Sequence, residues 1–363
     1  MSIPYRVWAC NPARRLMSVA MQSFLISTAF LIPASASGQT VPQSSVTKPP
    51  ATPTTVEAAH EKLVHGHEQE AIDALQALAA AEPPAPGANR ELGIAYYRTG
   101  KLVEADKSFA AAMTEDPRDA ESVQMRGLTQ FRLGQMAAAI PYLERTKLLA
   151  QASDVDVNYV LGRCYIGSHR YDDARTAFGA QYGLDPESGA PYLLNSQMLL
   201  REEMPEIAEE NAQKALQRAP AIALAHFALG KIYMARGDFA HALEQFEQER
   251  AINPTYPPLY QFLGDLYTRL NRRQKAQHAL TEALSLDQSS TGPFILMGKL
   301  FLEDNDPQTA ASYLEHAEQM DPSNFIIHNL LAQAYRQMGK KDDAKREFNA
   351  VSKIHAAENE SPR

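Results

Sequence analysis

The sequence predicts an all-α fold in which antiparallel helix pairs stack one on another into a solenoid. One alanine recurs along the chain at steps of 34 residues, with a single step of 35. Small and aromatic residues keep the same spacing relative to that alanine, and in most periods a glycine or an asparagine separates two apolar stretches. A sustained period of this length is the signature of stacked helical units.

Two columns of small residues define the two helices of each unit. The recurrent alanines are Ala71, Ala105, Ala139, Ala174, Ala208, Ala242, Ala276, Ala310 and Ala344. Twelve residues before each alanine stands a small residue: Ala59, Gly93, Gly127, Gly162, Ser196, Gly230, Gly264, Gly298 and Ala332. We expect the small column of the first helix to pack closely on the alanine column of the second helix.

Large side chains are expected to fill the groove between successive units. Three residues after the small column the chain has Tyr96, Gln130, Tyr165, Leu199, Tyr233, Tyr267, Phe301 and Tyr335. Four residues after the alanine it has Leu75, Phe109, Leu143, Phe178, Ala212, Phe246, Leu280, Leu314 and Phe348. Spacings of three and four residues place each set on one helical face. Since no unit alone can bury such a face, the units must stack.

Each unit also carries signals for a turn and for a helix end. Glycine and asparagine accept the left-handed backbone conformation that ends a helix. They share one column between the helices: Gly66, Gly100, Gly134, Gly237, Gly339, Asn271 and Asn305. Prolines follow the second helix at Pro83, Pro117, Pro186, Pro220, Pro254 and Pro322. The predicted solenoid covers residues 52–358, with units starting near 52, 86, 120, 155, 189, 223, 257, 291 and 325, and a polar tail at 359–363.

These columns resemble the tetratricopeptide repeat, a 34-residue helix pair. The best correspondence is Asn89, Leu92, Gly93, Tyr96, Gly100, Ala105, Phe109, Ala112 and Pro117. The tryptophan that the family often has near the start of the first helix is absent from every unit. The resemblance implies a right-handed α-solenoid of about nine repeats. It also implies a concave groove, lined by the first helices, that holds a peptide or a partner helix.

The first 36 residues are typical of a secretory signal peptide. Three arginines and no acid accompany an apolar run that ends at Ile32, and small residues follow it. Residues 37–51 are rich in Pro, Ser and Thr and are interpreted as a tether. We therefore expect a periplasmic or secreted protein without a stable membrane span. An uncleaved anchor is the alternative, which the polar residues within the apolar run disfavour.

Charge and cysteine content exclude further classes. The net charge is −8, and removal of the signal peptide takes away three basic residues and no acid, so that it falls to −11. A nucleic-acid partner is therefore not expected. Without Cys10 the chain keeps only Cys164, so an intramolecular disulfide is impossible. Packing alone must stabilise the fold.

We expect neither enzymatic activity nor a cofactor, because the repeats leave no residues for a catalytic domain. The enzyme alternative is a metal-dependent activity at His60, His65 and His67, since a His-x-His pair can ligate a metal. Gly66 marks a helix end there, so solvated turn histidines are the preferred interpretation and no metal site is predicted. Cys164 is expected to pack inward rather than to act as a nucleophile.

One stripe on the first helices lies opposite the packing columns and is expected to line the groove. Its basic and aromatic members are Arg90, Tyr97, Arg98, Phe131, Arg132, Tyr159, Arg163, Arg201, Phe227, Lys231, Arg269, Lys299 and Arg336. Nine basic residues stand along the stripe against four acids, although the whole chain is acidic. The stripe predicts a basic groove with aromatic anchors for an acidic or carboxylate-bearing partner.

Two alternatives stay open, one to the basic groove itself and one to its protein ligand. Four arginines of the stripe fall in the last turn of their helices, where the helix dipole alone favours a cation. They are Arg98, Arg132, Arg201 and Arg269. The ligand could also be an anionic glycan or a cell-wall fragment. The preferred hypothesis is a non-enzymatic protein-interaction scaffold of the cell envelope.

Overall fold

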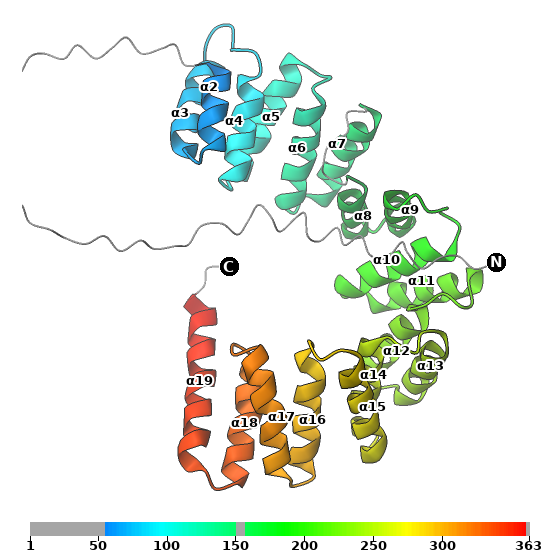
Figure 1. Cartoon of the computed structure of the whole chain (residues 1–363). Helices are drawn as coiled ribbons and strands as arrows, with labels where there is room; N and C mark the ends of the chain where they lie inside the picture. The colour runs from blue at the N-terminus through cyan, green and yellow to red at the C-terminus, as the bar shows by residue number, and fades with distance from the viewer. Residues whose placement is uncertain (1–54, 150–156, 361–363) are drawn as a thin grey trace, which may run out of the picture. The chain divides into compact units, whose positions relative to one another are not determined.

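The computed structural model of the chain describes residues 55–149 and 157–360, which form helices and no strand (Figure 1). The predicted signal peptide and tether, and most of the polar tail, lie outside the described residues. No helix in the described part is both long and apolar enough to cross a bilayer. The described residues belong to one compact unit.

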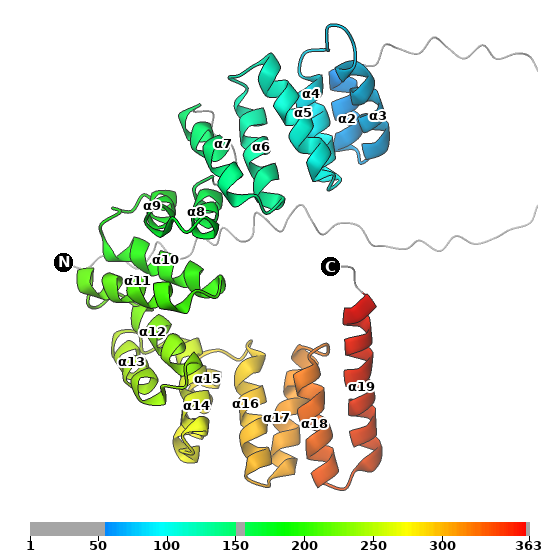
Figure 2. The same ribbon diagram turned by 180° about the vertical axis from the view of Figure 1, so that it is seen from behind.

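The helices alternate along the chain as the first and second members of antiparallel pairs (Figures 1 and 2). The pairs are α2 (Val56–Val64) with α3 (Glu68–Ala79), α4 (Ala88–Arg98) with α5 (Leu102–Glu115), α6 (Ala120–Arg132) with α7 (Met136–Leu148), α8 (Val157–Gly167) with α9 (Tyr171–Gln181), α10 (Gly189–Arg201) with α11 (Pro205–Arg218), α12 (Ala225–Ala235) with α13 (Phe239–Ile252), α14 (Pro257–Arg269) with α15 (Arg273–Leu286), α16 (Thr291–Glu303) with α17 (Pro307–Met320), and α18 (Phe325–Gln337) with α19 (Lys341–Glu360). The last helix therefore continues past the boundary predicted at residue 358.

The turn inside each pair has a left-handed residue, as the glycine and asparagine column predicts. Gly100 has φ +77° and Asn271 has φ +55°. The fourth and fifth units place His169 and Glu203 in the same column, and both have φ +58°. Backbone bonds that satisfy the helix end accompany the turn; Lys101 N–H, for example, donates to the Tyr96 carbonyl at 2.9 Å. Two turns thus adopt the geometry without the residue type that usually signals it.

The alanine column is buried throughout, and the small column also lies against the column of large side chains. A Cβ atom added at Gly230 would lie 2.3 Å from Cε1 of Phe246, and one added at Gly162 would lie 2.3 Å from Cε1 of Phe178. The Leu/Phe column therefore lies against the small column within its own unit. The column was expected to fill the groove between successive units, and Phe246 does contact Phe262 of the next unit. It also packs within its own unit, because the large side chain stands one helical turn beyond the alanine.

The fifth unit replaces this apolar contact with polar bonds. Ser196 stands in the small column and Ala212 in the large one, and the Ser196 hydroxyl donates to the Ala208 carbonyl at 2.7 Å. Beside it the amide of Asn195 donates to the side-chain oxygen of Asn211 at 3.0 Å. Both asparagines are buried. Hydrogen bonds therefore join α10 and α11 where a Gly and a Phe meet in other units.

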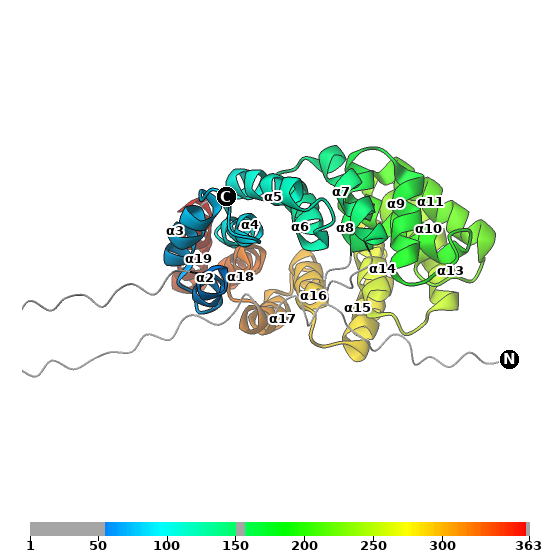
Figure 3. The same ribbon diagram turned by 90° about the horizontal axis from the view of Figure 1, so that it is seen from above.

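The first helices of most neighbouring units contact one another directly, while each second helix contacts the first helix of the next unit. In Figure 3, α4 and α6 lie on one side of the row and α5 and α7 lie on the other. Side chains on successive first helices are consequently close enough to touch across a unit boundary. This arrangement positions the candidate site.

Candidate functional site

Arginines of the predicted stripe lie over aromatic rings of the preceding unit. The Arg132 guanidinium carbon on α6 is 4.6 Å from the centre of the Tyr97 ring on α4. The Arg163 guanidinium carbon on α8 is 5.3 Å from the centre of the Phe131 ring on α6. Both distances are within the range of cation–π attraction. We call Tyr97, Phe131, Arg132 and Arg163 the arginine–aromatic ladder.

Polar contacts hold the two arginines of the ladder in place. Arg132 also donates from Nη1 to the Tyr97 carbonyl oxygen at 3.1 Å, and this carbonyl lies in the last turn of α4. Arg163 donates from Nη2 to a carboxylate oxygen of Glu202 at 3.0 Å. A guanidinium has five N–H donors, so each arginine keeps donors for another acceptor. The exposed Arg132 is the more accessible of the two.

Several other basic residues of the stripe are exposed and have no carboxylate partner among the described residues. These residues are Arg98, Arg201, Lys299 and Arg336. Lys231 is half-buried, and its Nζ lies 5.8 Å from the ring centres of both Phe227 and Phe262. Tyr159 is exposed and its ring lies near that of Phe178, with 6.2 Å between the ring centres. The structure thus places most of the predicted basic groups on an accessible surface.

Three of the predicted basic residues are paired with acids, which reduces the local excess of positive charge. Arg90 lies 3.4 Å from a carboxylate oxygen of Glu121 and 3.7 Å from one of Asp119. Arg269 Nε is 3.1 Å from a carboxylate oxygen of Asp265 on the preceding turn of the same helix. Glu202, the partner of Arg163, follows α10 and was not counted with the stripe. Arg132 and the unpaired cations carry the remaining positive charge.

The expectation that Phe227 is an exposed anchor was wrong. Only 9% of Phe227 is exposed, and its ring makes edge contacts with Tyr256 and Phe262 at 5.2 Å between centres. Those two residues come from the N-cap and the first half of α14 in the following unit, and they cover the Phe227 side chain on α12. Phe227 therefore stabilises the junction between α12 and α14 instead of offering a surface to a ligand.

The histidines near the first turn do not come together. His60 Nδ1 is 2.7 Å from a carboxylate oxygen of Glu91, and His65 Nδ1–H donates to the Glu61 carbonyl oxygen at 2.7 Å. His67 is the residue that precedes α3. Within the described residues the one group of three potential metal ligands lies elsewhere, at Glu318, His328 and Glu347. The metal-dependent activity considered for His60, His65 and His67 thus has no assembled site.

Cys164 is buried inside the fourth unit, as predicted. Burial raises the pKa of its thiol to about 12, although the nearby Arg163 works in the opposite direction. At neutral pH the side chain is therefore a protonated thiol and a poor nucleophile. It belongs to an apolar cluster that also includes residues of α7, α9 and α10.

We expect iodoacetamide to alkylate Cys164 at pH 8 about a hundredfold more slowly in the folded protein than in denaturant, because the thiolate is scarce and covered. Mass spectrometry of a Cys10→Ser chain measures the modification of this residue alone. Equal alkylation rates in the two conditions would mean that Cys164 is accessible to the reagent, which would contradict its burial on α8.

Comparisons with known proteins agree with the repeat. Models of the tetratricopeptide repeat match residues 56–120, 125–189, 223–256, 257–290 and 301–360, together more than half of the chain. Anaphase-promoting complex subunit 3 of Schizosaccharomyces pombe is 22% identical over 280 residues, which are 77% of this chain and 42% of that protein. Cellulose synthase 1 operon protein C of Komagataeibacter xylinus is 25% identical over 188 residues, 48% of this chain and 14% of that protein. The chain thus spans less than half the length of either relative.

Solved structures with a similar arrangement share little sequence with the chain. MamA from Desulfovibrio magneticus RS-1 has a TM-score of 0.43 and 16% identity, covering 47% of this chain and 96% of its own. YrrB, described as a TPR protein with an unusual peptide-binding site, has a TM-score of 0.41 and 19% identity, covering 50% of this chain and 93% of its own. The repeat models and the observed helix pairs carry the assignment. The chain belongs to the tetratricopeptide repeat family and has its all-α solenoid fold.

Proposed function

We propose that the protein is a non-enzymatic scaffold of the cell envelope that holds a protein or peptide partner against its first helices. The observation that carries this proposal is the arginine–aromatic ladder on α4, α6 and α8. The envelope setting rests on the signal-peptide pattern of residues 1–36, and the count of about nine repeats rests on the sequence period. The relatives support a repeat scaffold and leave the partner open.

The ladder suits an extended partner that carries carboxylates. Stacking on Tyr97 and bonding to its carbonyl group fix the Arg132 guanidinium before any ligand arrives. An arginine held in this way loses little side-chain entropy when it donates to a carboxylate. Arg163 can exchange Glu202 for a carboxylate of the partner, or Glu202 can pair with a basic group of the partner. Both outcomes favour a polar, charge-complementary contact.

Affinity capture with crosslinking, using mature protein from residue 37 against its native envelope, tests the proposal. The test variant is Arg132→Glu with Arg163→Glu. The matched control is Arg170→Glu with Arg250→Glu, which changes the charge equally at two half-exposed arginines that pair with Asp173 and Glu247 away from the ladder. We expect the test variant to capture its main protein partner at least about tenfold less than wild type, with the control unchanged.

The outcomes separate the alternatives. Equal capture by the wild type and the test variant would contradict a role for the ladder. Capture of an anionic glycan without any protein would contradict the protein scaffold and favour a glycan receptor. A similar loss in both variants would show that total charge, rather than the ladder, determines binding.

A further inference from the structure

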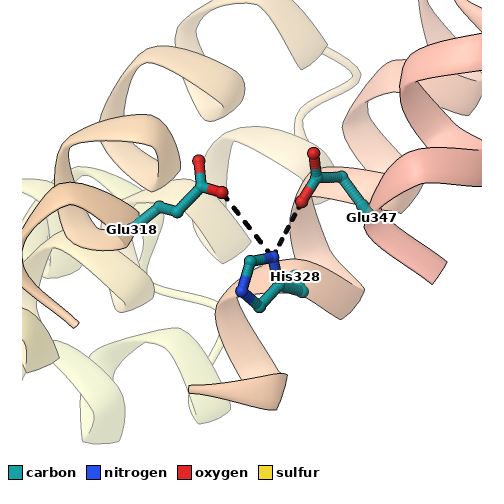
Figure 4. Close-up of side chains that lie close together, drawn as sticks. All are labelled: Glu318, His328 and Glu347. Carbon is teal, nitrogen blue, oxygen red and sulfur yellow. Dashed lines mark hydrogen bonds and ion pairs between the residues drawn. The ribbon is translucent and has the colours of Figure 1, made fainter. Parts of the chain in front are cut away.

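Three potential metal ligands from three successive helices meet near the carboxyl end of the solenoid. Glu318 lies on α17, His328 on α18 and Glu347 on α19 (Figure 4). His328 Nδ1 is 2.7 Å from a carboxylate oxygen of Glu347 and 3.7 Å from one of Glu318. The three ligand atoms all lie within 4.8 Å of one another. Figure 4 shows both carboxylates directed at the same ring nitrogen.

The other ring nitrogen fixes the orientation of the imidazole. His328 Nε2 is 2.9 Å from the Pro322 carbonyl oxygen, which can only accept, so Nε2 carries the hydrogen and donates. In the neutral imidazole Nδ1 then presents a lone pair to two carboxylates that also have only lone pairs to offer. The contact therefore needs a hydrogen on Nδ1, a hydrogen on a carboxyl oxygen, or a metal ion between the three groups.

The surroundings prepare the group for a cation. His328 and Glu347 are buried, and Arg346 Nε donates to the second carboxylate oxygen of Glu347 at 3.0 Å. Glu318 has 35% of its side chain exposed, which leaves one side of the group open to solvent. With His328 neutral, the two carboxylates outnumber Arg346, the one cation that pairs with them among the described residues.

A comparable position in the same chain shows that packing does not require the two acids. Three periods of 34 residues earlier, His226 and Gln245 occupy the positions of His328 and Glu347. His226 Nδ1 there is 2.8 Å from the side-chain oxygen of Gln245. The position of Glu318 is taken by Leu216. The earlier unit folds with an amide and a leucine at these positions. The helix packing of the repeat therefore does not require the two acids of the later unit.

We propose that Glu318, His328 and Glu347 form a binding site for a divalent first-row transition metal ion. One imidazole nitrogen with two carboxylates suits zinc and its neighbours, whereas calcium and magnesium prefer oxygen ligands alone. Donor atoms around tetrahedral zinc stand about 3.3 Å apart, so the His328–Glu347 contact opens by roughly half an ångström on binding. The open side by Glu318 leaves a position for water or for a group from a partner. The ion joins α17, α18 and α19.

Calorimetric titration of the untagged full chain with zinc chloride tests the site. We expect one saturable equivalent in wild type and at least about tenfold weaker binding in both Glu318→Gln and Glu347→Gln. Glu347→Gln recreates the folded His–Gln pair that the chain already uses at His226 and Gln245. A control with His60→Gln, His65→Gln and His67→Gln removes the other histidine group and should keep the wild-type affinity.

Two further measurements complete the test. Cobalt(II) added to the wild type should give visible d–d absorption that both glutamine variants lose. Zinc should raise the melting temperature of the wild type alone, since only a ligand that binds the folded state stabilises it. Absence of saturable zinc binding in wild type would overturn the site, as would unchanged affinity in both glutamine variants. Loss of binding in the triple histidine control would place the ion elsewhere.

Discussion

Replacing Phe246 with alanine is expected to lower the free energy of unfolding by about 3–5 kcal/mol. The ring is fully buried and contacts Phe227 and Phe262, with 5.9 and 6.0 Å between ring centres. It also lies against Gly230 of its own unit. Removing the ring leaves a cavity bordered by two units, so both the helix pair and the junction with the next unit lose contacts.

Phe348→Ala is the matched control for this substitution. Phe348 occupies the same repeat position on α19, but 42% of it is exposed. We expect its loss to cost about 1 kcal/mol or less, because little surface returns to water. Denaturant unfolding followed by far-ultraviolet circular dichroism measures both variants. Equal losses in the free energy of unfolding would mean that the repeat position, and not burial between units, determines how much the phenylalanine stabilises the fold.

The second large effect is expected from Gly230→Ala. The new Cβ would lie 2.3 Å from Cε1 and 2.4 Å from Cδ1 of Phe246, inside contact distance. The movement of Phe246 is restricted, because it is fully buried and the rings of Phe227 and Phe262 pack beside it. Overpacking of this kind costs about 1–3 kcal/mol, while alanine regains up to about 1 kcal/mol of helix propensity. We expect a net loss of about 1–2 kcal/mol in the free energy of unfolding.

A double-mutant cycle shows whether this loss comes from the contact itself. In the Phe246→Ala background the methyl group at position 230 meets no ring, so Gly230→Ala should be neutral or stabilising there. Denaturant unfolding of the four proteins gives the coupling energy. Additive losses would contradict the contact between the small and the large column.

The fold could be predicted from sequence because each of its determinants is local and recurs. A turn residue such as Gly100, and a buried alanine such as Ala242, repeat at a fixed period, so many weak signals support one register. The contact between the small column and the large column could not be predicted in the same way. The period shows that Gly230 and Phe246 share a unit, but not that the ring reaches back across the pair.

The candidate site could be predicted only in part. The positions of Arg132 and Arg163 follow from the helical face that they share. The burial of Phe227 does not, since residues of the next unit cover it. Glu202 pairs with Arg163 from 39 residues away. Likewise, three different helices bring together Glu318, His328 and Glu347. A comparison of His328 with its repeat equivalent His226 could have indicated this group, because acids stand near His328 where the earlier unit has an amide and a leucine.

The central claim is that the partner binds the first helices around the ladder, and site-specific photocrosslinking tests it most directly. A photoreactive amino acid is placed at Arg98 on α4 or Tyr159 on α8, and for comparison at Lys107 on α5 or Lys147 on α7; all four residues are exposed. We predict that irradiation in the native envelope joins one protein to the two first-helix positions and not to the second-helix positions. Crosslinks confined to Lys107 and Lys147 would contradict the account.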